Sequence, residues 1–144
     1  MAKSTASATW RGDLMSGSGQ TSLASGAAGP LDVSWPRRTE GTGSGTSPEE
    51  LIAAAHATCF SMALSHGLAQ AGHAPTQLDT EATVTFGQSD GGFAITNIAL
   101  TVRGQVDGID EAAFKEAAEG AKDGCPVSKA LKGNVPMSVE ASLA

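Results

Sequence analysis

Large aromatic side chains are scarce in this sequence. It contains no tyrosine, two tryptophans and four phenylalanines among 144 residues, whereas glycine occurs 18 times. A core built mainly from small side chains buries little apolar surface per residue, so we expect support from a partner subunit. The length is that of one compact domain, and we therefore expect a single domain over residues 1–144.

Basic residues are also few, with nine lysines and arginines against 15 aspartates and glutamates and a net charge of −6. The excess of negative charge repels phosphate backbones, so nucleic acid is not an expected partner. Long apolar runs are missing, because His56, Thr58 and Ser61 interrupt the most hydrophobic segment, and we expect no membrane span. Residues 1–10 lack the apolar stretch of a secretory signal, so we expect a cytoplasmic protein.

The pattern of apolar and turn residues predicts an α+β fold. The capping sequence Ser47-Pro48-Glu49-Glu50 predicts the start of a long helix that ends near Ala71, before Gly72. Small and apolar residues on nearly every side of this helix predict that other elements surround it. The other expected elements are strands at 8–14, 20–24 and 31–35, a hairpin of strands 79–86 and 93–106, helices at 110–122 and 126–131, and a last strand at 134–143.

Only two cysteines are present, Cys59 and Cys125. In a reducing compartment they are more often small packing residues, catalytic thiols or metal ligands than a permanent disulfide. Cys59 lies inside the expected long helix, where apolar burial would raise its pKa, and Arg37 and Arg38 are the concentrated candidates for a cation that holds it as thiolate. Cys125 precedes Pro126 at a helix start, where unpaired backbone amides favour an anion.

We expect neither a metal nor a cofactor. His56 and His66 share the expected helix with Cys59, but with the two cysteines they show no CxxC or HxxxH spacing. We interpret His56 as a histidine that packs in the core or supports a site indirectly, and His73 lies beyond the helix end. The glycine-rich segment 41–45 lacks the Gly-Lys-Ser/Thr ending of a phosphate-binding loop.

Two segments of the sequence resemble a known family. They are 45–60, GTSPEELIAAAHATCF, and 124–131, GCPVSKAL. These segments resemble the superfamily of osmotically inducible protein C (OsmC) and organic hydroperoxide resistance proteins, and residues 92–96 and 108–110 favour the OsmC branch. The resemblance covers nearly the whole chain. It implies an OsmC-like fold, in which antiparallel sheets from the N- and C-terminal strands wrap around a long central helix in an intertwined homodimer.

The resemblance also implies a thiol peroxidase for oxidative and osmotic stress defence, which reduces organic hydroperoxides and hydrogen peroxide. Cys59 would be the peroxidatic thiolate that becomes a sulfenic acid, and Cys125 the resolving thiol that closes a disulfide. By motif position Glu49 matches the family's glutamate and Arg38 best matches its arginine, with the adjacent Arg37 as the alternative. Glu49 would orient the guanidinium through a bidentate pair. A lipoyl-type dithiol or another cellular thiol would reduce the disulfide.

Helix geometry adds a constraint on this site. Glu49 and Cys59 are ten residues apart, which is about 15 Å along a helix axis. A glutamate and its arginine cannot act on a sulfur at that distance, so one chain's helix cannot supply both ends of one site. We therefore expect a homodimer with active sites at the subunit interface.

Two rival functions stay open at this point. One is a redox-sensing or ligand-binding stress protein that uses the same thiols without turnover. The other is a structural stress protein with inert cysteines, since a free cysteine often serves only as a small hydrophobic side chain. The sequence also leaves the preferred peroxide and the physiological reductant open.

Overall fold

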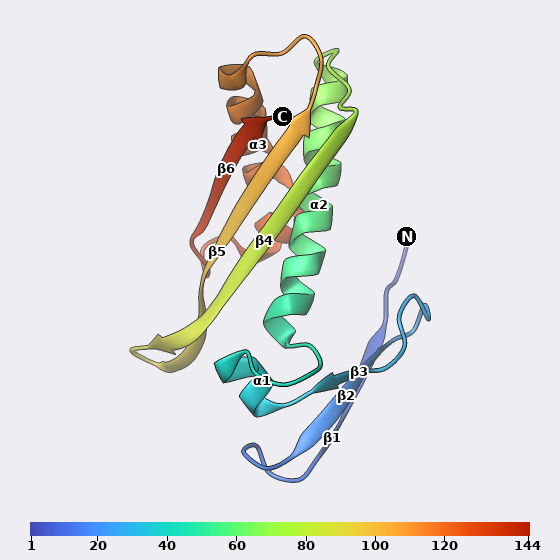
Figure 1. Ribbon diagram of the computed structural model, residues 1–144, viewed down its shortest axis with the longest axis vertical. Coiled ribbons are helices and arrows are strands. Elements are labelled where there is room, and N and C mark those ends of the chain that lie inside the picture. Colours follow the sequence, from blue (N-terminus) through green and yellow to red (C-terminus); the bar gives the residue numbers. More distant parts are fainter. The chain divides into compact units, whose positions relative to one another are not determined.

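The structure is a computed structural model that describes the whole chain, Met1 to Ala144. Its residues group into two compact units, 1–51 and 52–144, which are described in turn. Figure 1 shows the helices and strands along the chain, and together they form an α+β fold with two small sheets, as predicted. The expected single domain stays a prediction.

The N-terminal unit contains an antiparallel sheet of three short strands. They are β1 (Ala6–Arg11), β2 (Ser18–Leu23) and β3 (Leu31–Val33), in the order β1-β2-β3. Residues Ala6 to Arg11 pair with Leu23 to Ser18, and β2 continues the pairing to β3. The meander predicted from the sequence is therefore present, with bounds that differ by a few residues.

A short helix that the sequence analysis did not predict carries both adjacent arginines. It is α1 (Trp35–Glu40), which follows β3 directly. The Ser34 hydroxyl caps it by accepting a hydrogen bond from the Arg37 backbone N–H at 3.3 Å, and Gly41 ends it with a φ of 68°. The helical backbone of α1 therefore fixes the directions in which the Arg37 and Arg38 side chains leave the main chain.

The long helix α2 (Pro48–Gln70) begins where the capping sequence predicts. The Ser47 hydroxyl accepts a hydrogen bond from the Glu50 backbone N–H at 3.1 Å. The helix ends one residue before the predicted Ala71. Gly72 adopts a φ of 85°, and the backbone N–H of His73 donates to the Leu68 carbonyl at 2.8 Å. These contacts close the helix as a glycine C-terminal cap does.

Within residues 52–144, α2 buries only one side. Phe60, Leu64 and Leu68 are buried there, whereas Met62 on another side is 68% exposed. Ala54 and Ala55 are exposed as well. The expectation that other elements surround this helix is thus not met within residues 52–144.

The C-terminal unit is built on a second sheet, with the strand order β4-β5-β6. Strands β4 (Gln77–Ser89) and β5 (Gly92–Gln105) form the predicted hairpin, and β6 (Met137–Leu143) pairs with β5 in parallel. The expectation of purely antiparallel sheets is therefore wrong for this unit. Two helices intervene between β5 and β6, and such a long crossover returns the chain to the same end of the sheet.

The helices of this crossover are α3 (Glu111–Gly124) and α4 (Pro126–Leu131). Asp110 caps α3 as predicted, by accepting a hydrogen bond from the Ala113 backbone N–H at 2.8 Å. The α3 helix continues past the predicted end at Lys122, and Cys125 alone separates it from α4.

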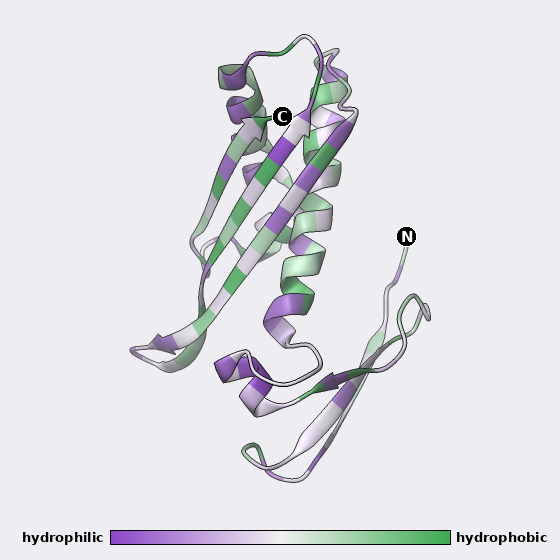
Figure 2. Ribbon diagram, in the orientation of Figure 1, coloured by the Kyte–Doolittle hydropathy of each residue, from purple (hydrophilic) through white to green (hydrophobic).

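The core of the C-terminal unit lies between the sheet and two helices. Figure 1 shows α2 and α3 behind the same face of the β4-β5-β6 sheet, and Figure 2 shows polar and apolar residues alternating along its strands. This alternation places one row of side chains against the helices and the other in solvent. The buried core residues are Phe60, Leu64, Leu68, Leu100, Val102, Phe114, Ala118, Ala121 and Cys125.

One helix, α2, is long and apolar enough to cross a membrane by length and composition. Its most apolar 18-residue window has a mean hydropathy of 1.3, and 22% of that window is buried. The core helix of a water-soluble protein can have the same length and composition, so this is weak support for a span. Length and polarity do not exclude a span, contrary to the argument from sequence, and the absence of a membrane partner stays a prediction.

Candidate active site

The two cysteines, 66 positions apart in sequence, are neighbours in the C-terminal unit. Both are free thiols, and Cys59 packs against the buried core cluster that contains Cys125, whose thiol raises the pKa of Cys59. Cys59 lies on α2 and is partly buried, whereas Cys125 at the junction of α3 and α4 is 0% exposed. Packing of α2 against the α3–α4 junction therefore brings together the two thiols that the sequence left unplaced.

The environment of Cys59 in this unit favours the protonated thiol. Burial raises the pKa of Cys59, and the neighbouring Cys125 thiol raises it further, while a hydrogen bond from the Val127 backbone N–H lowers it. The net direction is upward, because desolvation is the largest of these effects. This agrees with the expectation from sequence that apolar burial alone disfavours the thiolate, so a nucleophilic Cys59 needs an added positive charge.

Cys125 has a different set of contacts. It is the N-cap residue of α4, and its Sγ accepts a hydrogen bond from the Ser128 backbone N–H at 3.3 Å. The Ser128 hydroxyl lies 3.1 Å from the same sulfur and 2.7 Å from Nε2 of His56. His56 is the buried histidine of α2, so a chain of polar contacts runs from α2 to the sulfur of Cys125.

In the N-terminal unit, Arg38 and Glu49 form a bidentate ion pair. Nη2 of Arg38 lies 2.9 Å from Oε1 of Glu49, and Nε lies 3.1 Å from Oε1 and 3.3 Å from Oε2. Glu49 is 5% exposed, so its carboxylate depends on this guanidinium for compensation. The pairing expected for these residues is confirmed, and their part in catalysis stays a prediction.

Arg37 has different contacts. Its Nη2 pairs with Glu50 at 3.0 Å, and the Glu50 side chain is 57% exposed. Its Nε donates to the Gly45 carbonyl at 3.0 Å. An exposed ion pair and a backbone contact are typical of a residue that fastens a loop. Of the two adjacent arginines, Arg38 therefore has the partner expected of the family's arginine.

The segment before α2 is held against β3 by a close backbone approach. The Thr46 N–H donates to the Asp32 carbonyl at 2.8 Å, and Thr46 bridges to Val33. Gly45 makes this approach possible, since its φ is 103° and a Cβ there would lie 2.2 Å from the Asp32 carbonyl oxygen. The glycine thus helps to position the first turn of α2, which contains Glu49.

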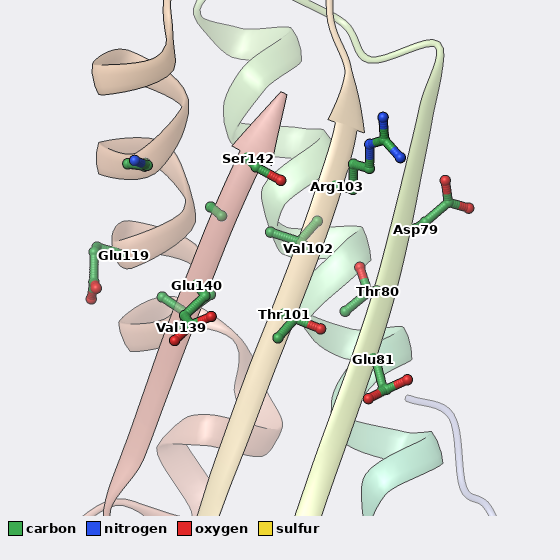
Figure 3. A pocket seen from close by; sticks show the side chains of 12 residues that line it. Asp79, Thr80, Glu81, Thr101, Val102, Arg103, Glu119, Val139, Glu140 and Ser142 are labelled. Carbon is green, nitrogen blue, oxygen red and sulfur yellow. The ribbon is translucent and has the colours of Figure 1, made fainter. Parts of the chain in front are cut away.

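A groove on the β4-β5-β6 sheet contains neither cysteine. It has a volume of about 750 Å³, and Figure 3 shows its labelled side chains on the three strands together with Glu119 of α3. Its lining carries Asp79, Glu81 and Glu140 against Arg103, and these residues lie on the exposed rows of the strands. No group of three or more His, Cys, Asp or Glu side chains is placed to hold a metal ion.

Sequence reasoning did not assign a role to Ser128. The residue was visible within the segment GCPVSKAL, but its contact with His56 joins positions 72 apart in the sequence. The buried placement of His56 agrees with the expectation that it packs in the core or supports a site indirectly. His66 is exposed on α2, and His73 lies beyond its end.

Similarities to known proteins agree with this arrangement. The family model described as OsmC-like protein matches residues 41–140. The sequence is 47% identical over 133 residues to peroxiredoxin OsmC of Escherichia coli, covering 92% of each chain. It is 31% identical over 111 residues to organic hydroperoxide resistance protein OhrB of Bacillus subtilis, covering 76% of this chain and 79% of that protein.

The fold agrees as well. The crystal structure of OhrB of Bacillus subtilis superimposes with a TM-score of 0.76 at 31% identity, covering 96% of this chain and 98% of that one. An organic hydroperoxide resistance protein of Elizabethkingia anophelis gives a TM-score of 0.75 at 26% identity, covering 97% and 96%. Together with the match of the family model over most of its length, these similarities show that the chain belongs to the OsmC-like family.

Proposed function

We propose that this protein is a cysteine-based peroxidase that reduces organic hydroperoxides and hydrogen peroxide. The observation that carries the proposal is that two free thiols, one partly exposed and one fully buried, are neighbours in the same packed core. The names of the relatives, a peroxiredoxin and organic hydroperoxide resistance proteins, support the same reaction and a role in stress defence.

In the first step, the Cys59 thiolate attacks one oxygen of the peroxide. The O–O bond breaks, Cys59 becomes a sulfenic acid, and the leaving oxygen takes a proton to become an alcohol or water. Cys59 suits this step because it is the more accessible of the two thiols. Since burial raises its pKa, we assign Arg38, oriented by Glu49, to stabilise the thiolate and polarise the peroxide.

In the second step, the sulfur of Cys125 attacks the sulfenic acid sulfur of Cys59. A disulfide forms, the S–O bond breaks, and water leaves. A dithiol of the lipoyl type or another cellular thiol then reduces the disulfide and restores both cysteines. Because Cys125 belongs to the core cluster against which Cys59 packs, this step needs no long movement of the chain.

The proposal includes a homodimer in a cytoplasmic setting. Glu49 and Cys59 are ten residues apart in the sequence of α2, so we assign the Arg38–Glu49 pair to Cys59 of a second copy. The exposed Ala54, Ala55 and Met62 of α2 support such an assembly, because a second copy would cover this apolar surface.

The test is peroxide-dependent thiol loss followed by turnover. We expect one equivalent of cumene hydroperoxide to consume both thiols, and dihydrolipoamide to restore them over repeated cycles. The Cys59→Ser variant should lose turnover completely. The Cys125→Ser variant should complete one reduction and then overoxidise, because its sulfenic acid has no partner.

Two outcomes would contradict the proposal. Wild-type turnover rates in Cys59→Ser would exclude this cysteine as the nucleophile. Oxidation of both thiols without any turnover, with several dithiols including thioredoxin, would favour the redox-sensing alternative. Mass spectrometry of the intact chain distinguishes the sulfenic, disulfide and overoxidised forms.

A further inference from the structure

A buried hydroxyl lies between the sulfur of Cys125 and a histidine. The Oγ of Ser128 lies 3.1 Å from Cys125 Sγ and 2.7 Å from His56 Nε2. His56 and Cys125 are 0% exposed and Ser128 is 2% exposed, so solvent does not compete for these contacts. All three residues belong to the C-terminal unit.

The direction of these hydrogen bonds follows from the histidine ring. Burial lowers the pKa of His56, so the ring is neutral and carries one N–H. Its Nδ1 is buried and has no hydrogen-bond partner. A proton on Nδ1 would leave a buried donor unpaired, whereas a proton on Nε2 leaves only a lone pair unpaired and gives Ser128 a donor. His56 therefore donates from Nε2 to the Ser128 hydroxyl oxygen.

Once Ser128 accepts this bond, its own hydroxyl proton is free to point at Cys125. The Ser128 backbone N–H also donates to Cys125 Sγ, at 3.3 Å. One residue thus directs two donors at one sulfur. Hydrogen bonds to an ionised acceptor are roughly twice as strong as neutral ones, so this arrangement favours Cys125 whenever its sulfur carries negative charge.

We infer that Ser128 and His56 are positioning residues that stabilise the negative charge that develops on the Cys125 sulfur, both when it attacks the Cys59 sulfenic acid and when it leaves the disulfide. The inference rests on the proposed function for the first of these steps. There the thiol proton of Cys125 and the hydroxide displaced from Cys59 combine as water, and the electron pair of the thiolate forms the S–S bond.

Burial decides which sulfur the reductant attacks. Cys125 is 0% exposed and Cys59 is partly exposed, so the reductant's thiolate reaches Cys59. The S–S bond then breaks with its electron pair on Cys125. The mixed disulfide forms at Cys59. The sulfur of Cys125 is the leaving group, and it accepts hydrogen bonds from the hydroxyl and the backbone N–H of Ser128.

The experiment measures the two thiol steps separately. After one equivalent of cumene hydroperoxide, Ser128→Ala should form the Cys59 sulfenic acid at the wild-type rate and close the disulfide on the order of 10- to 100-fold more slowly. Overoxidised Cys59 should accumulate under excess peroxide. Ser128→Thr keeps a hydroxyl and should recover most of the rate. Rapid acid quenching and mass spectrometry follow each species.

A second assay does not need peroxide. The disulfide is first formed with diamide, and its reduction by dithiothreitol is then timed. Ser128→Ala and His56→Leu should slow this reduction, and His56→Gln, whose amide can donate to Ser128, should slow it less than His56→Leu. This assay tests the inference even if wild-type protein does not consume peroxide, a result that would instead contradict the proposed function.

The matched control is Ser61→Ala. Ser61 is a partly buried hydroxyl on the same helix as His56, and it bonds to the Ala57 carbonyl and to Thr80 at 2.8 Å each. This control should leave both thiol steps within about twofold of wild type, while thermal unfolding verifies that each variant is folded. Wild-type rates of both disulfide closure and dithiothreitol reduction in Ser128→Ala would overturn the inference.

Discussion

Arg37 and Arg38 are adjacent in α1 but have different partners. Arg38 forms a bidentate pair with the buried Glu49, and Arg37 pairs with the exposed Glu50. If the assignment of Arg38 is right, the two positions differ sharply in their effect on catalysis. A comparison of single substitutions at the two sites therefore tests the assignment.

We expect Arg38→Met to lower the rate of peroxide reduction at neutral pH by about 100-fold, since a charged donor at the reacting atoms is lost. The pH profile should change as well. Burial raises the pKa of Cys59, so the rate rises with pH as thiolate forms, and loss of the cation should move this rise to higher pH. Stopped-flow measurement of sulfenic acid formation between pH 6 and about pH 10 gives both results.

Arg37→Met is the matched control and should change the rate only a few-fold. Because Arg38→Met strands the buried Glu49 carboxylate, the double variant Arg38→Met/Glu49→Gln separates lost charge from lost stability. The double variant should regain stability without regaining rate. Equal losses of rate in Arg37→Met and Arg38→Met would refute the assignment.

At residue scale, the sequence indicated candidate residues for the site but not the side chains around them. The motif around Cys59 and that around Cys125 indicated the thiols, and motif position indicated the partner of Glu49. The contact of His56 with Ser128 could not be predicted, because it depends on how α2 packs against α4. No local pattern reports a contact between positions 72 apart.

At the scale of elements, close packing of α3 on the sheet depends on a glycine. A Cβ at Gly104 in β5 would lie 2.5 Å from Cζ of Phe114, a fully buried residue of α3. We expect Gly104→Ala to lower the free energy of unfolding by about 1–3 kcal/mol, because the ring or the strand must move. Urea unfolding followed by circular dichroism measures the change.

Gly120 provides a control of opposite sign. It lies in α3, and no atom outside its own stretch of helix lies within 4 Å of the position its Cβ would occupy. Gly120→Ala should raise the free energy of unfolding by up to about 1 kcal/mol, the helix propensity difference. A stabilising Gly104→Ala would show that the packing of Phe114 adapts without cost.

Among the elements, those with local signals were predicted well. The caps Ser47 and Asp110 placed the starts of α2 and α3, and Pro126 placed the start of α4. The helix α1 was missed, although Ser34 before Trp35-Pro36 is a helix-start signal. The parallel pairing of β6 was also missed, because alternation along a strand carries no information on direction.

At the scale of the whole molecule, the exposed side of α2 bears on assembly. Met62 is 68% exposed on this helix, and we expect a homodimer that covers it. Met62→Glu should weaken the dimer and, since the proposed site takes Arg38 from a second copy, reduce peroxidase activity in parallel. Sedimentation velocity and activity measured over the same dilution series test both effects.

The control for this prediction is Ala112→Glu, an exposed residue in the first turn of α3. It adds the same charge away from α2, where a glutamate suits the helix dipole, and should leave the assembly unchanged. A wild-type chain that sediments as a monomer while fully active would contradict the shared site. The same result would remove the reason for assigning Arg38 across the interface.

The proximity of Cys59 and Cys125 has a kinetic consequence under heavy oxidant load. Closure of the disulfide is unimolecular and benefits from a high effective molarity, whereas further oxidation of the sulfenic acid depends on the peroxide concentration. The rate of disulfide closure is therefore independent of the peroxide concentration, whereas the rate of overoxidation increases with it. The protein should tolerate bursts of oxidant up to a threshold set by the ratio of these rates, and irreversible inactivation should begin only above it.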